Sequence, residues 1–283
     1  MTEFLLANEP TIRLLFFVVV LVVMALWEVV APRRTDVTRI VRWTSNLGIV
    51  VVNTVVLRLV FPTAAVGFAA VAEAHGWGLL NIIGMPTWVA FAVALVVLDI
   101  AIYIQHVMFH AVPVLWRLHR MHHADVGFDV TTGLRFHPVE IVLSMAFKIA
   151  VLAALGAPVA AVLVFEIVLN ATAMFNHGNV RLPRGLDAVL RLVVVTPDMH
   201  RVHHSIVPAE TNSNFGFNIP WWDRLFGTYC AQPAAGHDGM TIGIEQFRSP
   251  REQWLDKILA QPVMGPASGY PINRADEPEK TDG

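Results

Sequence analysis

The chain has 283 residues, of which 55% are hydrophobic and only 15% are charged, and its net charge at pH 7 is -2. Because soluble domains usually carry about 25% charged residues, this composition indicates a membrane protein with a polar part of substantial size. No basic excess is present to neutralise phosphates, so nucleic acid is not an expected partner. The single cysteine, Cys230, excludes an internal disulfide framework and an iron–sulfur cluster.

Apolar runs over residues 13–31, 47–72 and 87–110 predict three membrane-spanning helices. The first run is interpreted as an uncleaved span, because it is long and PRRTDVTR follows it instead of a small-residue cleavage site. Residues 139–176 are apolar again but contain LGAP at 155–158. Gly and Pro there split the segment, which predicts a tight helical hairpin with both ends on one side of the membrane.

The expected fold is therefore an all-α membrane protein with about four transmembrane helices. Two spans, a third that ends in HxxxH and the helical hairpin would carry a helical cap with the histidine clusters. A short helix is predicted within residues 249–261, where Ser249 is a plausible N-cap and Pro250 the first helical residue. We expect four parts along the chain. They are an N-terminal span with a basic loop (1–45), a membrane-embedded catalytic domain (46–230), a C-terminal segment with the short helix (231–261) and a flexible tail (262–283).

The basic residues indicate the orientation of the helices. Arginines follow the first run, the third run and the hairpin, whereas the loop EAHGWGLLNIIGMP contains no Lys or Arg. These arginines are Arg33, Arg34, Arg39, Arg42, Arg117, Arg120, Arg181 and Arg184. Because positive residues mark the cytoplasmic side, the N-terminus is expected outside and the histidine clusters on the cytoplasmic side, in what would be a bacterial inner membrane.

Three histidine motifs dominate the polar part of the chain: HVMFH at 106–110, HRMHH at 119–123 and HRVHH at 200–204. In a helix, residues three and four positions apart lie on one face, so the histidines of each motif converge. The eight histidines are His106, His110, His119, His122, His123, His200, His203 and His204. One zinc ion is satisfied by about four ligands, so a two-metal centre is the natural interpretation.

Ligation by nitrogen alone suits iron, zinc or copper about equally well. A histidine-rich metal-binding or transport protein is one alternative, although transport would need polar residues continuing along the spans. A membrane haem carrier is another, but it needs only two of the histidines. A zinc-dependent hydrolase is a third, and few carboxylates near the clusters could serve as its general base.

The order HxxxH, HxxHH and a distant HxxHH resembles the fatty acid hydroxylase and sterol desaturase superfamily, which are integral-membrane non-haem di-iron oxygenases. The resemblance covers roughly residues 90–230 and extends to DIAIYIQHVMFH, RFHPVE, FNHGNV, TPDMHRVHH and NFGFNIPWWDRLFGTY, which look like bacterial members. In one departure from many relatives, Val107 instead of Arg follows His106.

The resemblance implies further site residues. His177, in NHGN, is an expected ninth ligand, and His137, in RFHP, is either a ligand or a neighbour of one. His75 and His237 are expected to be bystanders.

The resemblance also implies the chemistry. Two iron ions, with zinc possible as isolated, would use O2 to hydroxylate or desaturate a C–H bond. The substrate would be lipid-like (a sterol, fatty acyl chain, ether lipid or carotenoid) and would enter from the bilayer. No haem-attachment motif or flavin fingerprint is present in the sequence, so electrons would come from a separate redox partner or a diffusible reductant such as a reduced pterin.

Several polar residues are expected to support the ligands. Asp99 lies two helical turns before His106 on the same face, and an intramembrane acid is costly and usually functional. It is expected to accept a proton from a ligand imidazole and so fix its tautomer. Tyr103 and Gln105 are candidates for a similar role. Weaker candidates are Asp125, Asn176 and Asp198, each next to a histidine cluster.

The WWDR stretch at 221–224 has two interpretations. Trp221 and Trp222 anchor the chain at the membrane interface, or they line the entrance for the substrate. Asp223 and Arg224 are expected to form a structural ion pair.

Overall fold

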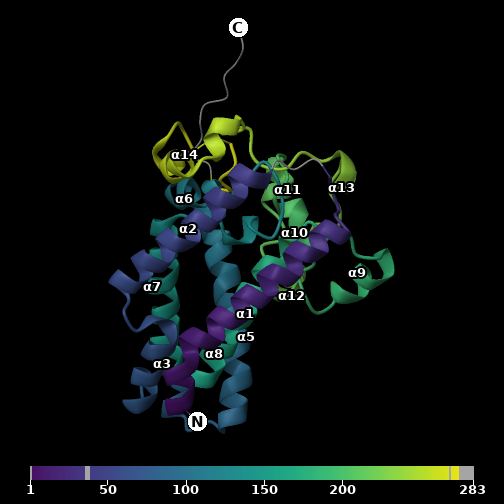
Figure 1. Ribbon diagram of the computed structural model, residues 1–283. Coiled ribbons are helices and arrows are strands. Elements are labelled where there is room, and N and C mark those ends of the chain that lie inside the picture. Colours follow the sequence, from purple (N-terminus) through teal and green to yellow (C-terminus); the bar gives the residue numbers. More distant parts are fainter. Residues whose placement is uncertain (1, 36–38, 268, 274–283) are drawn as a thin grey trace.

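The computed structural model describes residues 2–35, 39–267 and 269–273. Within these ranges the regular structure is helical, and the only extended pairings are the isolated bridges Pro32–Val180 and Ser205–Ile242. The all-α class is thus confirmed. Figure 1 shows long helices at one end of the molecule and a cap of short helices at the other, with the N-terminus at the end away from the cap.

Five apolar segments are long enough to cross a membrane, so the chain is an integral membrane protein. They are Glu3–Val30 in α1, Arg39–Ile82, Thr87–Ala111, Pro138–Leu155 and Val159–Asn176. The helices in them are α1 (Thr2–Val30), α2 (Arg39–Val60), α3 (Ala64–Ala74), α4 (Leu79–Ile82), α5 (Thr87–Ala111), α7 (Pro138–Leu155) and α8 (Val159–Asn176). The count agrees with two spans, a third helix and a hairpin when the two arms of the hairpin are counted separately.

The second apolar run is broken where a single helix was expected. α2 ends at Val60 and α3 starts at Ala64, with Pro62 between them. Proline lacks the N–H that would continue the helix, and its ring clashes with the preceding turn. The expected boundary between residues 45 and 46 also falls inside α2.

The hairpin turns where the sequence indicates. Gly156 caps the C-terminal end of α7 in the left-handed conformation, with φ 71° and ψ 46°. Glycine adopts this conformation without a steric penalty. A Cβ atom at Gly156 would lie 2.4 Å from the carbonyl oxygen of Trp77. Glycine is therefore required there both by the backbone conformation and by the close approach of the 77–78 loop.

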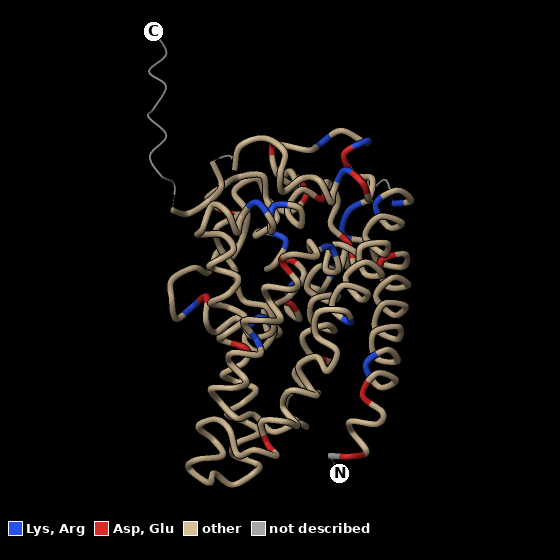
Figure 2. Tube along the Cα trace, turned by 90° about the vertical axis from the view of Figure 1, so that its left-hand side faces the viewer, with Lys and Arg blue, Asp and Glu red and all other residues tan. Residues whose placement is uncertain are grey.

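The cap is built from short helices. They are α6 (Pro113–His123), η1 (Thr132–Leu134), α9 (Arg184–Leu190), α10 (Pro197–His203), α11 (Pro208–Thr211), α12 (Trp221–Phe226), α13 (Gly236–Gly239), η2 (Pro250–Gln253), α14 (Leu255–Ala260) and η3 (Gln261–Val263). Figure 2 shows that most charged residues gather in this half of the molecule, while the lower parts of the long helices are nearly free of charge. The polar part of the composition is thus concentrated in the cap.

The C-terminal segment differs in part from expectation. Ser249 and Glu252 form a capping box and Pro250 is the first helical residue, but the helical stretch is interrupted at Trp254. Tyr270, within the expected flexible tail, is 1% exposed and stacks on Trp116 with ring centroids 5.5 Å apart. The described part of that tail therefore packs against α6, and residues 274–283 lie outside the described ranges.

Candidate metal centre

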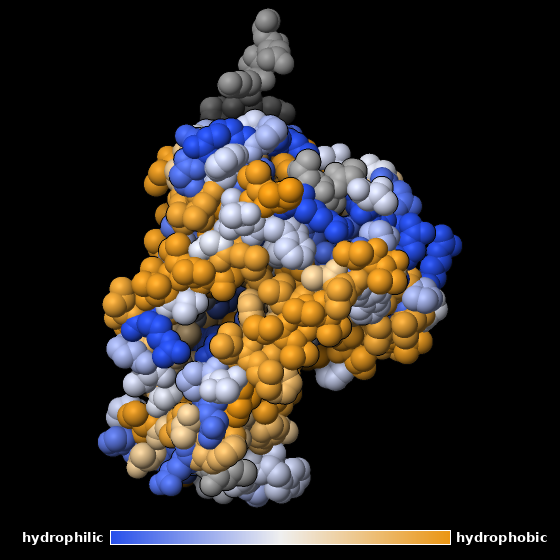
Figure 3. Space-filling view, in the orientation of Figure 1, coloured by the Kyte–Doolittle hydropathy of each residue, from blue (hydrophilic) through white to orange (hydrophobic). Residues whose placement is uncertain are grey.

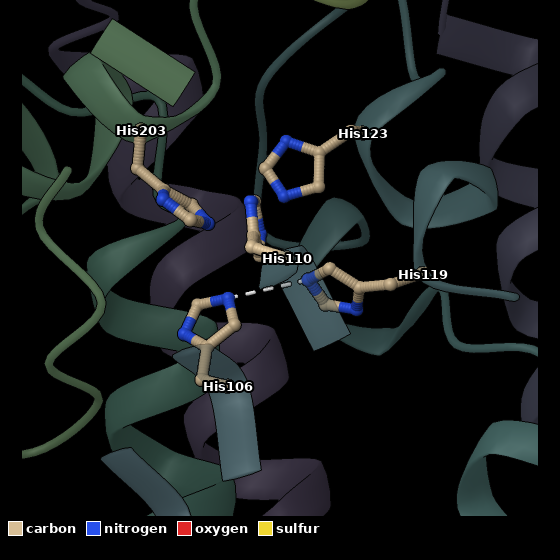
Figure 4. Close-up of side chains that lie close together, drawn as sticks. All are labelled: His106, His110, His119, His123 and His203. Carbon is tan, nitrogen blue, oxygen red and sulfur yellow. Dashed lines mark hydrogen bonds between the residues drawn. The ribbon is translucent and has the colours of Figure 1, made fainter. Parts of the chain in front are cut away.

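Nine buried histidines form two adjacent groups in which ring nitrogens converge. Within each group, one nitrogen of every histidine lies within 4.8 Å of those of the others. The five-histidine group is His106, His110, His119, His123 and His203, and the four-histidine group is His122, His177, His200 and His204. Figure 4 shows the rings of the five-histidine group pointing toward one another. The structure thus brings together the nine histidines that the sequence analysis names as expected ligands.

Local structure explains how the side chains reach one place. His106 and His110 lie one turn apart at the end of α5, and the chain then turns at Val112, which has extended backbone angles. Pro113 opens α6, a position where its missing N–H costs nothing. His177 caps the C-terminal end of α8, so it enters the centre from the hairpin.

Each HxxHH motif contributes to both groups. In the first motif, His119 and His123 belong to the five-histidine group and His122 to the four-histidine group. The second motif is divided the opposite way, with His200 and His204 in the four-histidine group and His203 in the five-histidine group. The ring centroids of His123 and His204, which belong to different groups, are only 4.5 Å apart. The two motifs therefore join the groups to each other as well as building them.

Hydrogen bonds orient three rings of the five-histidine group through one segment, residues 212–218. The Nδ1 atom of His106 donates to the carbonyl oxygen of Phe215 at 2.8 Å, and that of His203 donates to the carbonyl oxygen of Ser213 at 2.7 Å. The Nδ1 atom of His110 lies 3.1 Å from Oδ1 of Asn212. Because a carbonyl oxygen only accepts, each Nδ1 carries the proton and each Nε2 keeps its lone pair.

Two further rings are held in the same tautomer. The Nδ1 atom of His119 lies 2.7 Å from a carboxylate oxygen of Glu140, and the Nδ1 atom of His177 donates to the carbonyl oxygen of Ala173 at 2.7 Å. Such contacts to the outer nitrogen are typical of metal-ligating histidines, since they fix the ring and raise its basicity. Glu140 was not named by the sequence analysis, although RFHPVE contains it.

The inner nitrogens fit metal ions. The Nε2 atoms of His106 and His119 are 3.2 Å apart (Figure 4). The Nε2 atom of His177 lies 3.1 Å from Nε2 of His122 and 3.1 Å from Nε2 of His200. Where both Nδ1 atoms are the donors, as in His106 and His119, two lone pairs face each other and cannot form a hydrogen bond. Ligands at about 2.0–2.1 Å from one ion lie roughly 3 Å apart, so a bound cation accounts for this spacing.

Buried nitrogens without a partner give an independent sign of the same fit. Among the described residues, Nε2 of His110 and Nε2 of His203 make no hydrogen bond, and neither do both ring nitrogens of His123 and of His204. Buried polar atoms are normally paired, and unpaired ones call for an explanation such as an ion. Metal ions would supply the missing partners.

Burial keeps these imidazoles neutral. Desolvation and the neighbouring histidines hold the pKa of His122, His200 and His204 well below the ordinary value. Burial lowers the pKa of His177 to about 3, against the contrary effect of its hydrogen bond to Ala173. Neutral imidazole is the form that binds a metal ion, so the site is prepared for ligation at physiological pH.

The expected role of Asp99 is wrong. Its carboxylate accepts hydrogen bonds from Nδ2 of Asn218 at 2.6 Å and from Nε1 of Trp222 at 2.7 Å, and not from a histidine. The ring of His106 is turned toward Phe215 instead. Asp99 therefore fastens the end of the 212–218 segment, and Trp222 is drawn into the protein rather than placed as a membrane anchor.

The remaining candidates support neighbouring elements. The hydroxyl of Tyr103 lies 2.9 Å from Oγ1 of Thr228, and Asn176 donates to the carbonyl oxygen of Phe217 at 2.9 Å. Gln105 donates to Ser144.

Two aspartates expected near the ligands bind arginines instead. Asp125 is fully buried and pairs with Arg42, while Asp198 pairs with Arg201. Through Arg42, which also reaches Asp129 at 2.7 Å, helix α2 is tied to the chain that follows α6.

Three histidines lie outside both groups. His137 caps the N-terminal end of α7, where its Nδ1 accepts from the backbone N–H of Val139 and its Nε2 lies 3.2 Å from the carbonyl oxygen of Leu259. His75 is exposed beside α3, and His237 is buried in the cap with Nε2 3.8 Å from Asp198. Each thus has a position that does not depend on the metal centre.

The support from Asp223 was missed by sequence reasoning. Its buried carboxylate accepts from the backbone N–H of Phe215 at 2.7 Å and of Gly216 at 2.8 Å, and from Oγ1 of Thr228 at 2.7 Å. The expected ion pair with Arg224 is wrong, because Arg224 donates to the carbonyl oxygen of Arg191. Asp223 thus holds the backbone whose carbonyls orient the histidines, a role that leaves no periodic signal in the sequence.

A cavity leads from the five-histidine group into the membrane-spanning helices. It measures about 270 Å³ and is lined by His106 and His119 at one end and by residues of α1, α2, α7 and α8. Its apolar wall includes Phe17, Leu57, Ile102, Phe109, Met145 and Leu169. A second cavity of about 340 Å³ shares Arg13, Val50 and Glu166 with the first. Figure 3 shows the apolar surface hollowed between α1 and α2, with hydrophilic residues visible inside.

The chain is similar to lipid-oxidising enzymes. It is 37% identical to an ornithine lipid hydroxylase of Rhizobium tropici over 139 residues. This alignment covers 49% of this chain and 41% of the relative. It is 28% identical to the alkylglycerol monooxygenase of Xenopus tropicalis over 53% of this chain and 32% of the relative. The corresponding human enzyme is 26% identical over 64% of this chain and 39% of the relative.

The chain therefore spans between 32% and 41% of the length of these three relatives. No solved structure matches it. Residues 91–228 match the family model described as fatty acid hydroxylase. This range contains all nine clustered histidines, the segment that orients them and Asp223. Through this region, which holds the metal centre, the chain is similar to the fatty acid hydroxylase family.

Proposed function

We propose that the protein is a membrane-bound, O2-dependent oxygenase that hydroxylates or desaturates a C–H bond of a lipid. The observation that carries the proposal is the pair of buried histidine groups at the inner end of a cavity with a largely apolar wall. A metal transporter would need a polar pathway onward through the spans, and a haem carrier would leave most of the nine histidines unexplained. Both alternatives are therefore disfavoured.

Two iron ions are the proposed cofactors, one in each histidine group, and zinc is a possible substitute in isolated protein. Bound iron would supply the reduction of O2 and the oxidation of the C–H bond. The protein's own share is positional. Glu140 and the carbonyls of Ser213 and Phe215 hold the protons on the Nδ1 atoms, which leaves the Nε2 atoms free to bind.

The cavity would position the substrate and exclude water. Its apolar wall fits the hydrocarbon part of a lipid, and its neighbours α1 and α2 face the region that the bilayer would occupy. The relatives act, by their names, on an ornithine lipid and on alkylglycerols, both of which are lipids. A lipid that enters from the bilayer would thus meet the five-histidine group first.

Electrons would come from a separate redox partner or a diffusible reductant. The arginines at the cap end of the helices support a cytoplasmic location for the metal centre, because positive residues mark the cytoplasmic side. Bacterial inner membrane is the location that we propose. A cytoplasmic reductant would then reach the cap directly.

Metal content of the protein purified in mild detergent tests the proposal first. About two irons per chain and O2-dependent turnover of a lipid with a reductant would support it. His122→Ala, in the four-histidine group, should lose metal and activity, and His203→Ala, in the five-histidine group, should lose activity. His75→Ala at the exposed loop should retain metal and activity. Full activity in either ligand variant, or one metal or none in folded wild-type protein, would refute the two-metal assignment.

A further inference from the structure

Three side chains at the histidine end of the 270 Å³ cavity carry an oxygen atom without a hydrogen-bond partner. These atoms are Oδ1 of Asn53, Oε1 of Gln105 and Oε2 of Glu140. Among the described residues that line this cavity, these three carry the buried side-chain polar atoms without a hydrogen-bond partner. All three are acceptors. This end of the cavity thus carries acceptors that no donor of the described residues satisfies.

The side chains are fixed by their other contacts. Asn53, on α2, donates through Nδ2 to the carbonyl oxygen of Phe136 at 2.9 Å, so its oxygen must be the free atom. Glu140 uses one carboxylate oxygen to bind His119, which leaves the other free. Gln105 donates to Ser144 and is next to His106 in the chain. The free oxygens therefore surround the end of the cavity where the metal ions are proposed.

The same three residues are nearly inaccessible to solvent. Asn53 is 8% exposed, Gln105 is 7% exposed and Glu140 is 3% exposed. Buried polar atoms are normally paired, so these acceptors call for a partner within the cavity. A donor group on a ligand in the cavity would give these oxygens the hydrogen-bond partner that they lack.

The charged residues farther along the cavity do not show this excess. Glu166 pairs with Lys148 and also with Arg13 at 3.1 Å, and Arg13 also pairs with Glu9 at 2.7 Å. These charges satisfy one another and connect α1, α7 and α8. Among the described residues that line this cavity, the buried polar atoms with no hydrogen bond at all therefore lie near the histidines.

We propose that the cavity selects a lipid that carries an O–H or N–H group close to the carbon that is oxidised. The donor group would bind the acceptor oxygens of Asn53 and Gln105, and the hydrocarbon part would lie along the apolar wall. Alcohols, amides and amines fit this description, whereas hydrocarbons, ethers and esters without a donor do not. The inference rests on the proposed function, whose substrate class it narrows.

Binding of two isomeric probes tests the inference without turnover. Dodecan-1-ol has a hydroxyl donor, and 1-methoxyundecane has the same atoms but no donor. The full chain in phosphatidylcholine nanodiscs would be titrated with each probe in competition with radiolabelled dodecan-1-ol. Wild-type protein should bind the alcohol at least about tenfold more tightly, because a site with buried acceptors rejects a ligand that leaves them unpaired.

Asn53→Leu and Gln105→Met each remove an acceptor with little change in size, and each should lower the preference at least about threefold. Thr54→Val is the matched control, because Thr54 lines the same cavity but its hydroxyl donates to the carbonyl oxygen of Val50 in its own helix. This control should keep the full preference. If Asn53→Leu fails to fold, Gln105→Met carries the test.

Equal affinity for the two isomers in wild-type protein would overturn the inference, as would an unchanged preference in the folded acceptor variants. A preference that disappears in those variants supports the inference even if no lipid is oxidised, in which case the proposed function fails alone. Conversely, turnover of lipids with no preference for donors would leave the oxygenase in place and refute the selectivity.

Discussion

Asp223→Asn tests whether the 212–218 segment positions the metal ligands. The carboxylate of Asp223 uses Oδ1 for Phe215 and Thr228 and Oδ2 for Gly216. An asparagine can keep the first two bonds but then turns its amide NH2 group toward the backbone N–H of Gly216. One buried N–H is left unpaired, which costs about 1–3 kcal/mol. A Cβ atom on Gly216 would lie 2.6 Å from Oδ2, so the backbone has no room to move inward.

The cost should appear in metal affinity, because the displaced segment carries the acceptors of His106 and His203. Changes in such outer contacts typically weaken metal binding about 10–100-fold. This range corresponds to about 1.4–2.8 kcal/mol, close to the cost of the unpaired N–H. We therefore expect the affinity of the five-histidine group to fall by that factor while the protein stays folded.

Competition with a chromogenic chelator measures the affinity, and a thermal melt in detergent reports folding. Asp256→Asn is the matched control, because it makes the same substitution on the cap at an exposed pair with Arg251, and it should change neither readout. Wild-type metal affinity in Asp223→Asn would show that the segment does not position the ligands. An equal loss in the control would show that the assay reports general damage to the cap.

Two further outcomes follow from buried charges. Arg42→Met should cost about 3–5 kcal/mol of stability, because it leaves Asp125 and Asp129 buried without their partner, and a loss below about 1 kcal/mol would contradict the network. Metal-free protein should become less stable as the pH falls from about 6.5 toward 3. In the unfolded chain His177 takes up a proton in this range, whereas in the folded protein burial lowers its pKa to about 3 and keeps it neutral. The shifted pKa of His177 alone lowers the free energy of unfolding by about 5 kcal/mol across that pH window. Denaturant titrations at several pH values measure this free energy, and His177→Gln should make it depend less steeply on pH.

Local patterns in the sequence were sufficient to predict the main framework. The spacing of His106 and His110, and of the histidines in both HxxHH motifs, repeats with the period of a helix, so their convergence follows from α-helical geometry. The hairpin followed from Gly156, because the left-handed conformation at a helix end has a strong residue preference. Both features depend on residues that are near one another in the chain.

Contacts between distant segments were not predictable in the same way. Asp99 lies on the same helical face as His106, which suggested a partner there, but Trp222 and Asn218 approach from more than a hundred residues away. Hydrogen bonds to backbone carbonyls, such as that of Phe215, leave no residue preference to detect. His137 was left open as a ligand because its actual role, capping a helix, is one that Asn, Asp, Ser and Thr usually perform.

The unequal size of the two histidine groups leads to a last prediction. Loss of one ligand leaves four in the five-histidine group, enough to satisfy a tetrahedral ion, but only three in the four-histidine group. His200→Ala should therefore retain about one metal per chain after dialysis, whereas His110→Ala should retain nearly two. Metal analysis of both variants, each checked for folding, decides the matter. If they lose metal equally, the groups act as one shared site, and the division that the structure shows between His122 and His123 has no consequence for binding.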